Sequence, residues 1–99
     1  MIRGTTPVLE FTLPFSTSTL AEAYISFAQR KEIIFEKTLS DCTCDADTLT
    51  LKLTQAETLS LKENRSTEIQ IRAKTIDGDA LASDIICVDT DRILKDGEI

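Results

Sequence analysis

The stretch that decides the fold runs from Thr48 to Ala80 and reads TLTLKLTQAETLSLKENRSTEIQIRAKTIDGDA. Leucines occupy every second position from 49 to 53 and alternate with polar residues, which is the period of a half-buried β-strand. Residues 68–74 alternate in the same way. Asp77-Gly78 then supplies two residues that tolerate a positive φ, a strong signal for a hairpin. The stretch therefore predicts strands joined by tight reversals.

One helical turn is predicted between these strands. Thr54 and Glu57 have the spacing of a capping box, in which a hydroxyl and a carboxylate three residues apart satisfy the backbone of a helix start. The predicted turn covers residues 55–59. After the Asp77-Gly78 reversal, one continuous strand is predicted from about Ala80 to Asp89.

The first half begins with a strand at the edge of a sheet. Large apolar residues occupy every second position from Leu9 to Phe15, and Pro7 and Pro14 bracket the run. Proline donates no hydrogen bond to a neighbouring strand, so this segment is predicted to be an edge strand or to bulge near Pro14.

Residues 20–28 fit two patterns. Thr19 and Glu22 have capping-box spacing, and apolar residues recur at helical intervals, but the segment alternates equally well. A short β-branched run, residues 31–38, follows a polar reversal, and this favours a hairpin over a helix. Its register stays open: a two-residue loop pairs Phe27 with Ile34, whereas a three-residue loop pairs Phe27 with Phe35. Either register turns one apolar group toward the less buried face.

These segments predict one all-β domain covering residues 1–99, with residues 92–99 as a mobile tail. The expected architecture is an immunoglobulin-like two-sheet sandwich of about six to seven strands with one short helical turn, and a partly open barrel is the alternative. The expected core comprises the apolar residues at the alternating positions that should face the interior: Leu9, Phe11, Leu13, Phe27, Leu49, Leu51, Leu53, Ile69 and Ile71.

The composition disfavours several classes of partner and of chemical activity. The chain of 99 residues has 17 acidic and 11 basic residues, a net charge of −6, so nucleic acid and anionic membranes are poor partners. Histidine is absent, which removes the usual general base and the commonest metal ligand, and no catalytic residue, metal ligand or cofactor is expected. Cys42 and Cys44 are separated by one residue, and free thiols are expected, with Cys87 buried in a strand.

An acidic loop is the one alternative ligand site. Asp41, Asp45 and Asp47 offer the oxygens that hard cations prefer, so a small-ligand module that binds a carbohydrate or a cation through residues Asp41–Asp47 is the second functional hypothesis. The loop lacks the glycine and the terminal glutamate of an EF-hand, and these aspartates are better explained as a solvated loop between strands.

Two stretches resemble small proteins and amino-terminal modules encoded in phage and prophage structural regions of Gram-positive bacteria. They are residues 1–15 with Phe27-Ala28-Gln29, and residues 53–97, which contain a Leu-Thr-x-x-Glu-Thr turn, an alternating strand and an Asp-Gly reversal. The resemblance implies a non-enzymatic module of a virion tail, baseplate or neck. It carries over no catalytic residue.

The expected partner is therefore a protein, either the chain itself as a homo-oligomer or a neighbouring virion component. The first seven residues lack the apolar segment of a signal peptide, so the bacterial cytoplasm during synthesis, and then the virion, are the expected locations. Contact is expected through an edge strand or through the tail, whose candidate interaction residues are Arg92, Ile93, Leu94 and Ile99.

Overall fold

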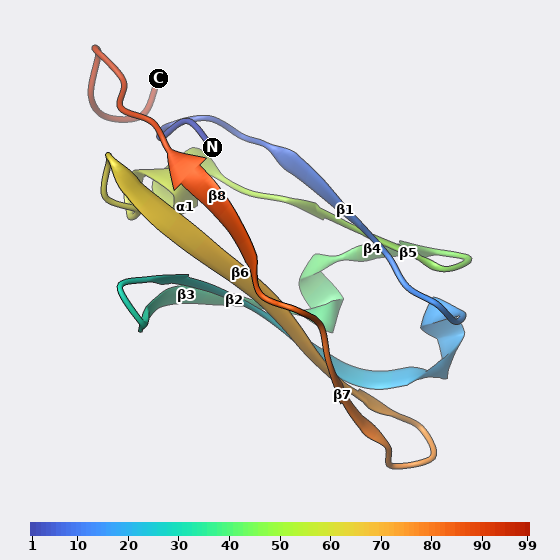
Figure 1. Cartoon of the computed structure of the whole chain (residues 1–99). Coiled ribbons are helices and arrows are strands. Elements are labelled where there is room, and N and C mark those ends of the chain that lie inside the picture. Colours follow the sequence, from blue (N-terminus) through green and yellow to red (C-terminus); the bar gives the residue numbers. More distant parts are fainter.

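The computed structural model describes residues 1–99 and arranges them as two antiparallel sheets packed together (Figure 1). The smaller sheet has the order β1 (Val8–Thr12), β5 (Thr48–Lys52) and β4 (Thr43–Asp45). The larger sheet has the order β3 (Glu32–Thr38), β2 (Leu20–Gln29) and β6 (Arg65–Thr75), with β7 (Ala80–Ala82) and β8 (Ile86–Thr90) both paired to β6. The predicted all-β, two-sheet sandwich is confirmed.

The core lies between the sheets, where the two alternating patterns meet. Ile25, Phe27, Ile69 and Ile71 come from the larger sheet, and Leu51 and Leu53 come from the smaller one. Six of the nine residues expected in the core are buried. The prediction was wrong for three residues: Leu9 and Phe11 are only half-buried, because β1 has a neighbouring strand on one side alone, and Leu13, which follows β1, is half-buried beside an open groove.

Residues 20–28, whose sequence fits both a helix and a strand, form a strand. Residues 20–29 form β2 and not a helix, and the hairpin to β3 turns through Arg30 and Lys31, whose φ angles are 52° and 65°. Gln29 pairs with Glu32 across this two-residue loop, yet Phe27 pairs with Phe35 because a bulge absorbs one residue. The loop therefore has the length expected in one alternative, whereas the pairing of Phe27 with Phe35 is the one expected in the other. The exposed apolar group is Ile33.

The strand predicted from Ala80 to Asp89 is broken in two, which corrects that prediction. Ser83 interrupts it: its backbone N–H donates to the carbonyl of Ile71 at 2.9 Å, and its Oγ accepts from the N–H of Ile71 at 3.0 Å. Cys87 is exposed and not buried, because it pairs with Glu68 on the outer face of β6, opposite the face of Ile69.

The predicted capping box is present at α1 (Gln55–Leu59). The N–H of Glu57 donates to Thr54 Oγ1 at 3.2 Å, and the N–H of Thr54 donates to Glu57 Oε1 at 2.9 Å. Two 3₁₀ turns, Thr17–Thr19 and Leu39–Asp41, were not predicted. None of the helical segments has the length and apolar character needed to cross a bilayer.

The last residues lie against their own domain. The N–H of Ile99 donates to Gln55 Oε1 at 2.9 Å, and Gln55 Nε2 donates to the Ile99 carbonyl at 3.1 Å. Ile93 is half-buried, and its Cδ1 lies 3.0 Å from the position that a Cβ on Gly4 would take. Residues 92–99 are thus anchored at two points.

Candidate interaction surfaces

The three aspartates of the predicted acidic loop lie in different elements. Asp41 ends a 3₁₀ turn, Asp45 ends β4, and Asp47 lies in the turn to β5. The Asp41 carboxylate accepts from the N–H of Thr38 at 2.8 Å, and this bond chiefly holds the pKa of Asp41 below its usual value. The structure brings together no group of three or more acidic, cysteine or histidine side chains that could hold a metal ion.

The three cysteines differ in how far they are exposed to solvent. Cys42 is half-buried, and burial raises the pKa of its thiol, with the neighbouring Cys44 and Asp41 adding to the shift. Its Sγ lies 3.6 Å from the carbonyl of Thr38, to which it donates. Cys44 and Cys87 are exposed, and all three cysteines are free.

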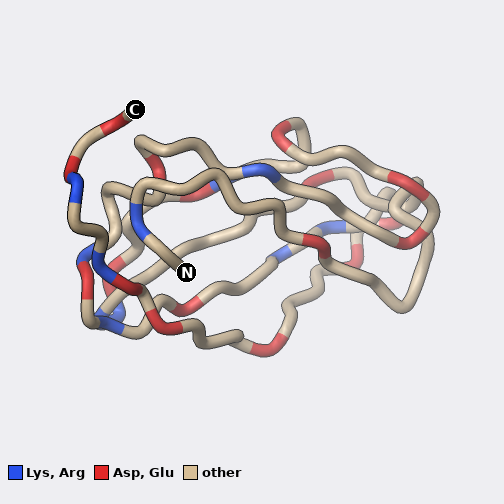
Figure 2. The backbone as a smooth tube through the Cα atoms, turned by 90° about the horizontal axis from the view of Figure 1, so that it is seen from above, with Lys and Arg blue, Asp and Glu red and all other residues tan.

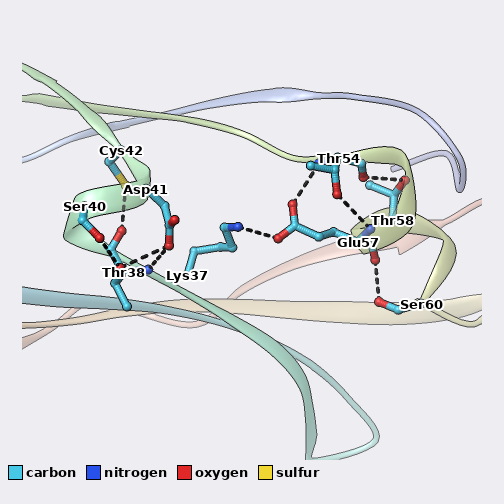
Figure 3. Close-up of polar contacts among 9 residues, drawn as sticks. All are labelled: Lys37, Thr38, Ser40, Asp41, Cys42, Thr54, Glu57, Thr58 and Ser60. Carbon is cyan, nitrogen blue, oxygen red and sulfur yellow. Dashed lines mark hydrogen bonds and ion pairs between the residues drawn. The ribbon is translucent and has the colours of Figure 1, made fainter.

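An ion pair closes one side of the sandwich (Figure 3). Lys37 Nζ of β3 donates to Glu57 Oε2 of α1 at 2.5 Å, and both side chains are about four-fifths buried. The hydrogen bond to Glu57 raises the pKa of Lys37 above its usual value. Burial would raise the pKa of Glu57, but the hydrogen bonds from Lys37 and Thr54 outweigh it and lower that pKa. These contacts tie the larger sheet to the smaller one.

A buried polar cluster reinforces the end that holds the chain termini. Gln29 Nε2 donates to the carbonyl of Lys62 at 2.9 Å, and Gln29 Oε1 accepts from the Lys62 N–H at 2.8 Å. Beside the Gln29 side chain, the hydroxyls of Thr67 and Thr90 form a hydrogen bond with each other. Every buried side-chain polar atom has a hydrogen-bond partner. The contacts of the cluster are those of a structural network.

The strand edges differ in how far they are protected. The β3 edge is bent by its bulge, and β4 has only three residues, both of which discourage pairing with another chain. On the other side, the chain start covers the end of β8: the Arg3 N–H donates to the Asp91 carbonyl at 3.1 Å, and Met1 contacts Asp89. The edges of β1 and β7 beyond this point have no such cover.

Between these two uncovered edges lies an open, mostly apolar groove of about 400 Å³. Its walls come from the end of β1 and the following loop on one side and from β7 and Ser83 on the other. Leu81 pairs with Ala73, so it lies on the inner face of the larger sheet, yet it is 39% exposed. The main apolar lining residues are Leu13, Pro14, Phe15, Leu20, Ile71 and Leu81.

Backbone hydrogen bonds fix the shape of this groove. The Leu13 N–H donates to the Asp47 carbonyl at 2.7 Å, and the Thr17 N–H donates to the Ala46 carbonyl at 2.8 Å. The Ile76 N–H donates to the Thr19 carbonyl at 2.8 Å. Three loops that are distant in sequence are therefore tied together around the groove, which we call the groove end of the molecule.

The groove end is acidic. Asp84 lines the groove, Asp45 ends β4, and Asp47, Asp77 and Asp79 belong to the β4–β5 and β6–β7 reversals beside it. Residues 4–29, 38–51 and 75–91 contain no lysine or arginine. Figure 2 shows Asp and Glu without Lys or Arg at the end of the molecule farthest from the termini. The nearest cations, Arg72 and Lys74, lie on the outer face of β6, opposite buried Ile71.

The predicted interaction residues lie at the other end (Figure 1). Arg92, Leu94 and Ile99 are exposed, with 92% of Leu94 and 91% of Ile99 accessible, whereas Ile93 packs beside Gly4. Asp96 lies 3.7 Å from the Arg3 guanidinium. The structure therefore places these four residues on one terminal segment, separate from the groove.

Comparisons with protein families, with curated proteins and with solved structures found no match for this chain.

Sequence reasoning did not identify the groove end as a surface. It placed Leu13 in the core, whereas Leu13 lines the groove. Two signals were available: the edge-strand prolines, and the absence of cations from residues 4–29, 38–51 and 75–91. Only the fold shows that these segments meet.

Proposed function

We propose that this chain is a non-enzymatic assembly module of a phage- or prophage-encoded particle, and that it binds itself or a neighbouring virion protein. The observation that carries the proposal is the uncovered side of the sandwich. There, Leu13 and Phe15, which follow β1, and Leu81 of β7 are left partly exposed around the groove. Apolar surface of this kind at a strand edge is typical of a protein contact, since an added chain covers it and extends the sheet.

Two further features support an assembly role over catalysis. The groove is lined mostly by apolar side chains, together with the carboxylate of Asp84 and the hydroxyls of Thr12 and Ser83, and it has no cysteine, lysine or histidine that could activate a hydroxyl or act as a nucleophile. The resemblance of residues 1–15 and 53–97 to phage structural modules supports the particle context. A virion module needs a stable scaffold and a complementary surface, and this small sandwich supplies both.

Incorporation into particles tests the proposal. In the bacterium that encodes the chain, tagged wild type and tagged Leu81→Asp would be expressed while the prophage is induced, and particles would be separated on a density gradient. We expect wild type to co-sediment with particles or with their assembly intermediates, and Leu81→Asp to be depleted at least severalfold.

Ile33→Asp is the matched control, because Ile33 is exposed on β3 at the opposite edge. It should be incorporated like wild type, and circular dichroism should show that both variants are folded. Wild type that is absent from particles and from every assembly intermediate would overturn the proposal. Equal loss of both variants would move the contact away from the groove.

A further inference from the structure

We propose that the groove end of one copy receives the segment Arg92–Lys95 of a second copy, so that chains associate head to tail. This inference rests on the proposed function, because it names the partner and the two surfaces of an assembly contact. It is carried by the match between two surfaces of this chain that lie at opposite ends of the molecule.

The receiving surface combines apolar walls with a negative rim. Leu13, Phe15 and Leu81 supply the walls, Asp84 lies in the lining, and Asp47 lies in the turn bonded to Leu13. Because three loops are bonded together around it, the groove needs little rearrangement to accept a segment, and a preformed site spends less binding free energy on ordering. An apolar groove with an acidic rim selects a segment that has apolar and basic side chains.

The segment Arg92-Ile93-Leu94-Lys95 has this composition. Two cations flank two apolar residues, and Leu94 is almost fully exposed. Ile93 packs beside Gly4, and the bonds between Gln55 and Ile99 hold the end of the chain, so the segment projects as a fixed loop. Asp91 precedes the segment and Asp96 follows it, and Asp96 lies 3.7 Å from the Arg3 guanidinium.

The positions of the two surfaces determine the kind of assembly. The molecule measures 47 × 26 × 17 Å, and Figure 1 shows the carboxyl terminus and the β6–β7 reversal at opposite ends. A contact between unlike surfaces is heterologous, so each copy offers one donor and one acceptor, and association continues beyond a dimer into a ring or an open row of copies. A contact limited to four residues and one groove is small, and interfaces below about 1,200 Å² belong to weak, transient encounters.

Charge reversal tests the contact. Sedimentation of the wild-type chain at rising concentration should show species larger than a monomer. The association should weaken at least severalfold when ionic strength rises from about 0.1 M to about 1 M, because the screening length falls from about 10 Å to about 3 Å. The donor variant Arg92→Glu/Lys95→Glu and the acceptor variant Asp47→Lys/Asp84→Lys should each remain monomeric when studied alone.

Mixing the two variants should restore association, since each then offers a segment and a groove of opposite charge to the other. The control Arg30→Glu/Lys31→Glu makes the same charge change as the donor variant at the exposed β2–β3 turn, and it should associate like wild type. Association of the donor or acceptor variant at the wild-type level would overturn the inference, as would failure of the mixture to associate.

A wild-type chain that stays monomeric at every concentration would also overturn the inference. The proposed function has a separate readout, because incorporation into particles through Leu81 requires no contact between two copies. The two proposals can therefore fail independently.

Discussion

At the scale of single residues, burial follows from the number of neighbouring strands as well as from hydrophobicity. Phe11 and Leu49 face each other across the β1–β5 pair, and both point between the sheets. Leu49 is fully buried and Phe11 is half-buried, because β5 has strands on both sides and β1 has one. The residues that hold the sandwich together are thus those of β5, β2 and β6.

Leu51→Ala is expected to destabilise the protein by about 2–5 kcal/mol, because it removes a fully buried side chain from the centre of the core and leaves a cavity. The free energy of unfolding, measured by chemical denaturation, checks this. Leu94→Ala is the matched control, and as an exposed residue it should change stability by no more than about 0.5 kcal/mol. A loss below about 1 kcal/mol for Leu51→Ala would contradict the assigned core.

At the scale of elements, the regular segments were predictable and their interruptions were not. β5, α1, β6 and the Asp77-Gly78 reversal follow from local periodicity and capping, which depend on residues close in sequence. The break at Ser83 depends on its hydrogen bonds to Ile71, twelve residues away, which no local pattern contains. The groove end escaped prediction for the same reason, since it needs three distant loops to meet.

The β2–β3 turn offers a test at this scale. Arg30 and Lys31 both adopt a positive φ, the conformation of the two-residue turns that favour Asn-Gly, and a side chain there costs about 1–2 kcal/mol per residue. Lys31→Gly should therefore raise the free energy of unfolding by about 1 kcal/mol, because glycine adopts this conformation without steric strain.

Thermal or chemical denaturation of Lys31→Gly checks this expectation. Lys62→Gly is the matched control, since Lys62 is also exposed and does not have a positive φ, and it should bring no gain in stability. A Lys31→Gly protein that is less stable than wild type would show that flexibility added to the unfolded chain outweighs the relieved strain.

At the scale of the whole molecule, the two sides of the sandwich are built differently. On the β3 side, the ion pair between Lys37 and Glu57 joins the larger sheet to the helical turn that follows β5. On the β1 side, the groove leaves the sheets uncovered between Leu13 and Leu81. One side is therefore closed by polar contacts within the chain, and the other leaves apolar side chains partly exposed.

The ion pair makes the stability of the molecule depend on pH at both extremes. The folded-state pKa of Glu57 is lowered from 4.5, so its contribution is present above pH 4.5 and is lost as pH falls through the folded-state pKa. The pKa of Lys37 is raised from 10.5, so its contribution is present below pH 10.5 and is lost as pH rises through the folded-state value.

Glu57→Gln should lower the free energy of unfolding by about 1.5–3 kcal/mol near pH 7, because glutamine can keep the helix cap but leaves Lys37 without its charged partner. Denaturation from pH 3 to pH 11 should show the gap to wild type narrowing at both ends, where Glu57 gains a proton or Lys37 loses one. Glu63→Gln, which removes an exposed carboxylate, should follow the wild-type profile. A gap of constant size across this range would mean that the ion pair is not what joins the two sheets on the β3 side.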